Sequence, residues 1–80
     1  MKTYIVLLAV DVFERRQHAD LIKSERFKSL NSVYRFLSGD RDDISRDDVL
    51  FYGLTEFSDA CNNQELELEL WWVSYVNIEN

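Results

Sequence analysis

Hydrophobic positions open the chain as one continuous block. Residues 4–10 are apolar at every position, and the wider segment 3–13 is rich in β-branched and aromatic residues. Such residues favour strands, and a strand that is apolar on both faces is typical of the centre of a sheet. The pattern therefore predicts a central strand over 3–13, followed by a polar turn over 14–18.

The next hydrophobic positions recur at helical spacing and predict an amphipathic helix. They form one apolar stripe: Phe27, Leu30, Val33, Tyr34 and Leu37. Either Ser24 or Ser29 is placed to cap the start of this helix, and Gly39 suits its end, where a left-handed residue is often needed. Residues 19–24 are consistent with either a short second strand or the beginning of the helix.

A charged connector over 40–48 leads to the apolar segment 49–52, which predicts either a short strand or one helical turn. Gly53 interrupts that segment. Thr55 is the expected N-cap of a second helix over 56–63. The inward positions of that helix are Phe57, Ala60 and Cys61.

Acids and leucines alternate over 65–70, directly before the apolar run 71–78. Period two predicts a long strand with leucines on one face and carboxylates on the other, and the break in alternation at Leu70 and Trp71 suggests a bulge. Trp71 and Trp72 then point to opposite faces. One enters the core, and the other meets a second layer, solvent or a partner, where tryptophan is a common hot spot.

These elements predict one α+β domain over 1–80. The expected architecture is a small two-layer domain, in which an antiparallel sheet has long N- and C-terminal strands and two helices pack on one face. The composition is 46% hydrophobic and 14% aromatic, which is sufficient for a core and argues against disorder.

Catalytic and metal-binding patterns are sparse. His18 and Cys61 are single residues of their types, so one chain lacks the ligands of a Cys/His zinc site. The acids from Asp40 onward begin like a calcium loop, but Ser45 and Phe51 stand where that loop requires glycine and glutamate. We therefore expect no catalytic residue, no metal and no cofactor, and do not expect an enzyme.

The net charge of −6 is unevenly distributed. Residues 1–39 carry seven Lys/Arg against four Asp/Glu, a net of +3, whereas residues 40–69 carry two against ten, a net of −8. Such acids either keep a small protein soluble or form a patch that attracts a basic protein surface and disfavours nucleic acid and anionic lipid. The expected partner-binding residues are Asp40, Asp42, Asp43, Asp47, Asp48, Glu65, Glu67, Glu69, Trp71 and Trp72.

The single cysteine and the lack of an apolar run of about 20 residues indicate a cytoplasmic protein outside membranes. In size and charge the chain is similar to compact acidic proteins that phages and mobile elements encode against host defences. The leading hypothesis is an inhibitor of a host nucleic-acid-handling protein, such as a CRISPR effector or nuclease, that acts through an acidic, nucleic-acid-mimicking surface. The alternative is a self-associating structural module that forms a homodimer through an edge strand and exposed aromatics.

Overall fold

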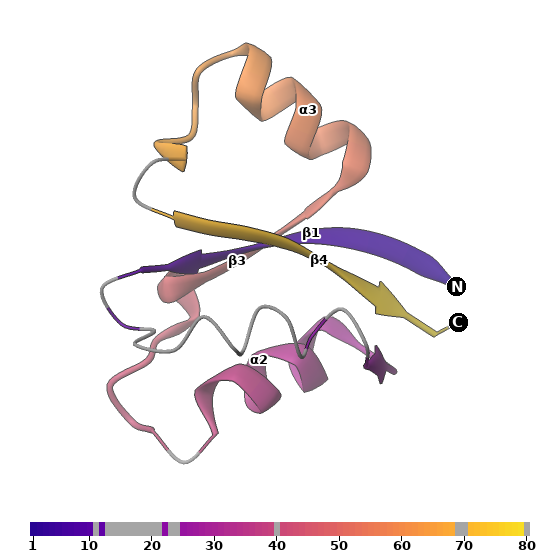
Figure 1. Cartoon of the computed structure of the whole chain (residues 1–80), viewed down its shortest axis with the longest axis vertical. Coiled ribbons are helices and arrows are strands. Elements are labelled where there is room, and N and C mark those ends of the chain that lie inside the picture. Colours follow the sequence, from indigo (N-terminus) through magenta and orange to yellow (C-terminus); the bar gives the residue numbers. More distant parts are fainter. Residues whose placement is uncertain (11, 13–21, 23–24, 40, 69–70, 80) are drawn as a thin grey trace.

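The computed structural model places a four-stranded sheet between two helices (Figure 1). It describes residues 1–10, 12, 22, 25–39, 41–68 and 71–79. In chain order the elements are strands β1 (Lys2–Ala9) and β2 (Arg26–Phe27), helix α2 (Leu30–Ser38), the 3-10 helix η1 (Arg46–Asp48), strand β3 (Val49–Gly53), helix α3 (Leu54–Asn62) and strand β4 (Trp71–Ile78). The predicted turn over 14–18 lies outside the described residues, as does all of 19–24 except Ile22.

The strand order is β2-β4-β1-β3, so β1 is central as its apolar sequence predicts. β1 pairs antiparallel with both long neighbours, with Leu8 opposite Val49 on one side and Trp72 on the other. The expected antiparallel pairing of the terminal strands is therefore confirmed, and with it the α+β class. The sheet is mixed, however, because the two residues of β2 pair in parallel with the end of β4.

The main core lies between the sheet and α2. It includes Val6 and Leu8 of β1 and Val33 and Leu37 of α2, together with Ile22, Phe27, Ile44, Val49, Val76 and Ile78. Burial of each such side chain stabilises the fold by about 1.5–3 kcal/mol relative to exposure. This core explains why the helical stripe and the alternate positions of three strands are apolar.

Helix α2 begins later than its apolar stripe predicts. Ser29 is the N-cap, and its Oγ accepts a hydrogen bond from the backbone N–H of Ser32 at 3.2 Å. Phe27 therefore belongs to β2, although it is buried in the same core. Gly39 ends the helix with a φ of 54°, which confirms the predicted stop.

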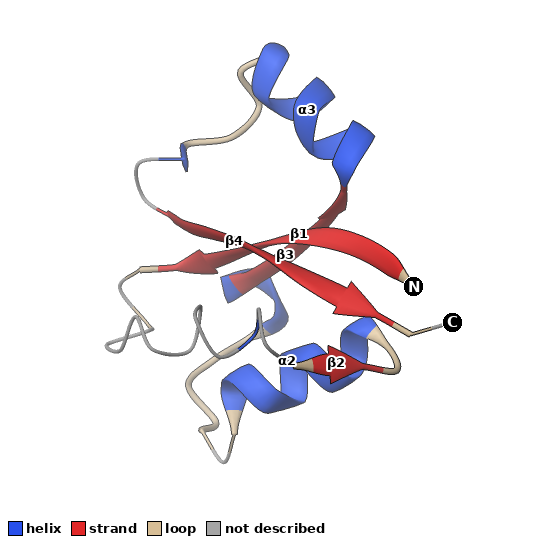
Figure 2. Cartoon of the chain, turned by 45° about the vertical axis from the view of Figure 1, so that its right-hand side comes forward, coloured by secondary structure: helices blue, strands red, loops and turns tan. Residues whose placement is uncertain are grey.

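Helix α3 lies on the face of the sheet opposite to α2, whereas both helices were expected on one face (Figures 1 and 2). The reason is topological. The connection β2-α2-β3 crosses the sheet in one direction and β3-α3-β4 crosses back, between strands that run parallel. Connections between parallel strands of one sheet are nearly always right-handed. Two connections that cross the sheet in opposite directions can both be right-handed only when their helices cover opposite faces.

Two further boundaries differ from the prediction. The N-cap of α3 is Gly53 rather than Thr55, and the carboxylate of Glu56 lies where a Cβ at position 53 would stand. Residues 65–68 are not part of a strand, and β4 begins at Trp71. Gln64, with a φ of 56°, turns the chain after α3, and 65–68 then return it to the start of β4. The bulge expected at Leu70 lies outside the described residues.

Candidate protein-binding surface

The two tryptophans lie on opposite faces of β4, as expected. Trp72 is opposite Leu8 and packs against the core beneath α2. Trp71 is opposite Ala9, on the α3 side, and is half-buried. Because side chains alternate along a strand, Val73 and Tyr75 share the face of Trp71.

This face of β4 is open. Helix α3 packs over β3 and β1, where Phe57 meets Tyr52 and Ala60 is buried. Val73 and Tyr75 remain 39% and 48% exposed, and Leu68, just before the strand, is 36% exposed. We call Trp71, Val73 and Tyr75 the β4 face. It is an apolar and aromatic row on a rigid strand, the kind of surface that supplies binding hot spots.

Both acidic segments come to one end of the sheet. The segment 41–48 precedes β3 and the segment 65–68 precedes β4, and these two strands are parallel because each is antiparallel to β1. Both segments therefore lie where β3 and β4 begin, at the left of Figure 1. We call this the acidic end.

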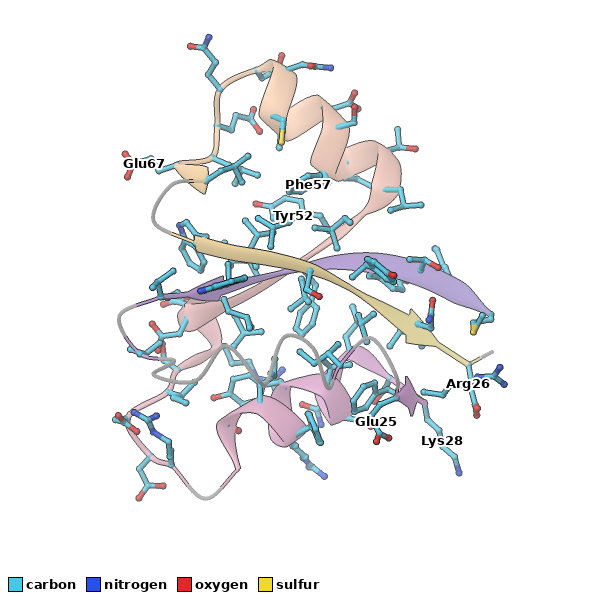
Figure 3. All side chains as sticks on the ribbon, viewed as in Figure 1. Glu25, Arg26, Lys28, Tyr52, Phe57 and Glu67 are labelled. Atoms are coloured by element: carbon cyan, nitrogen blue, oxygen red, sulfur yellow. The ribbon has the colours of Figure 1, made fainter. Side chains whose placement is uncertain are left out.

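The acidic end is divided by the sheet rather than forming one row of carboxylates. The segment 41–48 follows α2 and lies on its side, whereas Glu67 lies on the α3 side (Figure 3). Asp42, Asp47, Glu65 and Glu67 are exposed. Asp40 and Glu69, expected in the same patch, lie outside the described residues. Glu65 and Glu67 are thus the described carboxylates of the acidic end on the same side of the sheet as the β4 face.

Two of the expected aspartates are occupied by local interactions. Arg41 forms a bidentate pair with Asp43, with N–O distances of 2.9 and 2.5 Å, and lowers the pKa of that carboxyl. Asp48 accepts hydrogen bonds from the backbone N–H of Ser45 at 2.7 Å and from its hydroxyl at 3.2 Å, which closes a capping box around η1. Asp48 is therefore part of the scaffold.

Contacts to α2 hold the acidic connector in place. The Tyr34 hydroxyl donates to the carbonyl of Ile44 at 2.7 Å, and the Arg46 guanidinium lies over the Tyr34 ring at 4.4 Å. Arg46 also donates to the side-chain oxygen of Asn31. These contacts fix the backbone that carries Asp42 and Asp47.

The opposite end of the sheet carries basic groups. Lys2 is opposite Ile78, and Arg26 is beside Asn77, so both flank the end of β4. Figure 3 shows Arg26 and Lys28 together there, with Glu25 nearby. Carboxylates lie at this end too, since Glu79 follows β4 and Glu56 lines a cleft with Lys2, so the strands run between an acidic end and an end of mixed charge.

Other features of the described residues bear on thiol chemistry, metal binding and membrane insertion. Cys61 is a free, half-buried thiol on α3. No group of three or more His, Cys, Asp or Glu residues within the described part of the chain is placed to hold a metal ion. His18 lies outside it. None of the described helices is long and apolar enough to cross a membrane.

Val73 and Leu68 are the candidate residues that the sequence-based prediction of the site omits. Alternation along 71–78 places Val73 and Tyr75 with Trp71, but it does not indicate which face a helix covers. Which face is covered follows from the connection β3-α3-β4, which places α3 over β3 and β1. Comparisons with protein-family models, with curated proteins and with solved structures found no match, so the candidate surface rests on the geometry of this chain.

Proposed function

We propose that the chain is a protein-binding modulator that acts by covering a surface of another protein. The observation that carries this proposal is the open β4 face, with exposed Glu65 and Glu67 on the same side of the sheet. An apolar, aromatic centre with a charged rim is the usual anatomy of a protein interface. The partner that fits it has an apolar depression flanked by lysine or arginine.

Nucleic-acid-handling proteins are the partner class with such basic surfaces, and we propose one of them as the target. Carboxylates at the rim speed the encounter with a basic surface and contribute to specificity, while the buried aromatic centre supplies most of the affinity. The interaction should therefore weaken with salt through its association rate more than through its dissociation rate.

The test compares three variants of the tagged full chain. The first replaces Val73 and Tyr75 with alanine, the second replaces Glu65 and Glu67 with glutamine, and the control replaces Glu25 and Glu79, at the opposite end of the sheet, with glutamine. Proteins captured by the wild type from lysate of the source cell are identified, purified and titrated with each variant. We expect the first variant to lose binding by about a hundredfold and the second by about tenfold, with the control unchanged.

A competition experiment tests whether the partner is a nucleic-acid-handling protein. A duplex oligonucleotide should displace the chain from the purified partner if the two share a basic surface. Simultaneous binding of both would contradict that assignment of the partner. Unchanged affinity of the Val73→Ala, Tyr75→Ala variant would contradict the proposed surface altogether.

A further inference from the structure

Strand β3 forms one edge of the described sheet, since β1 is its strand neighbour and no described strand lies beyond it. Its five residues, Val49–Gly53, contain no charge and no proline. Natural edge strands are commonly protected from pairing by lysine, proline, a bulge or very short length. A strand of five residues is of ordinary length, so β3 lacks these protections.

We propose that β3 pairs antiparallel with β3 of a second copy of this chain, which joins two sheets into one. A twofold axis through Phe51 places Phe51 opposite its copy and Leu50 opposite Tyr52 of the other chain. In this register, paired residues of the two copies point to the same side of the joined sheet. Phe51 lies on the α2 side with Val6, whereas Leu50 and Tyr52 lie on the α3 side with Leu7 and Ile5. Apolar side chains thus meet apolar side chains on both faces.

Charge along the strand favours antiparallel over parallel pairing of the two copies. β3 begins directly after the segment with Asp42, Asp47 and Asp48. It ends at Gly53, which is opposite Tyr4 of β1. Antiparallel pairing keeps the two acidic segments apart, because it brings the start of β3 in one copy to the end of β3 in the other, where Lys2 and Glu56 line a shallow cleft together with Gly53. Parallel pairing would instead set the two acidic segments side by side, which like charges disfavour.

The dimer is independent of the proposed modulator function. β1 lies between β3 and β4, so pairing at β3 leaves the β4 face of each copy open. A dimer would present two such faces.

Sedimentation of the wild-type chain from low to high micromolar concentration tests the dimer. Each chain has a mass of 9.5 kDa. A rise to twice that mass is expected, with amide exchange at Val49–Gly53 slowing as concentration rises. A monomer at every concentration overturns the proposal.

Disulfide trapping locates the interface. In a Cys61→Ala background, Phe51→Cys should form a crosslinked dimer under mild oxidation, because directly opposed residues on antiparallel strands are close enough for a disulfide. Tyr75→Cys in the same background is the matched control and should stay uncrosslinked. Crosslinking at Tyr75 alone, or concentration-dependent protection at β4 instead of β3, overturns the proposal. If Phe51→Cys does not fold, the exchange data on the wild type decide.

Discussion

The ring of Tyr52 meets the ring of Phe57 edge-on, with centroids 6.3 Å apart and planes inclined at 63°. This contact joins the end of β3 to the first turns of α3, as Figure 3 shows. It holds α3 over β3 and β1, on the face opposite to α2, and so leaves the β4 face open. The candidate surface therefore depends on a contact made elsewhere on the sheet.

Replacing Phe57 with alanine should destabilise the fold by about 2 kcal/mol, below the value for a fully buried phenylalanine because this ring is half-buried. Urea unfolding followed by tryptophan fluorescence measures the change. Leu54→Ala, at a position that is 56% exposed on the same helix, is the control and should change stability by less than about 0.5 kcal/mol. Equal effects of the two substitutions would contradict the packing described for α3.

Gly39 should be intolerant of a side chain for reasons of backbone geometry. Its φ of 54° with a ψ of −128° lies in a region that L-residues rarely adopt, and no atom stands within 4 Å of an added Cβ. We expect Gly39→Ala to cost about 1–3 kcal/mol from strain alone. Asn63→Ala, at the C-cap of α3 with a φ of −88°, is the control and should have little effect in the same thermal unfolding assay.

Asp48 and Asp47 are adjacent acids with different roles. Asp48→Ala removes the capping box around η1 and should destabilise the chain by about 1 kcal/mol. Asp47→Ala, at an exposed position, should leave stability unchanged within about 0.5 kcal/mol. Chemical denaturation of both variants makes the comparison. A larger loss for Asp47 would show that the cap is misassigned.

Asp43 should titrate abnormally because of Arg41. The paired guanidinium holds the pKa of Asp43 below its ordinary value of 3.8. A carboxyl whose folded pKa is depressed contributes stability above its unfolded pKa, and this contribution is lost as pH falls through the folded pKa. The effect on stability should be small because both side chains are exposed.

Carboxyl-carbon NMR measures this titration directly. In Arg41→Gln the pKa of Asp43 should rise toward 3.8, and added salt should move it part of the way in the wild type. Arg35→Gln is the control and should leave it unchanged. An unaltered titration in Arg41→Gln would contradict the pairing.

The local elements follow well from sequence pattern, whereas their placement does not. The continuous apolar run of β1 and the stripe of α2 report burial directly, because each periodicity matches its own backbone geometry. The side chosen by α3 depends on the direction in which the chain crosses the sheet. That direction is set by the order of the strands in the sheet, and a short stretch of sequence carries no information about strand order.

The acid–leucine alternation over 65–70 shows the same limit for the site. Period two is typical of a strand, but residues 65–68 must carry the chain from the end of α3 back to the start of β4. Leu66 is half-buried and Leu68 exposed, so the leucines do not line one buried face. The expected row of carboxylates is consequently replaced by two groups at one end of the sheet.

Cross-saturation NMR on the chain bound to its purified partner tests the central claim most directly, because it reports which side chains the partner touches. The account predicts saturation transfer to Trp71, Val73 and Tyr75, and none to Phe36 on α2 or Leu54 on α3, although both of these are exposed. Transfer centred on α2 or α3, with the β4 face unaffected, would contradict it.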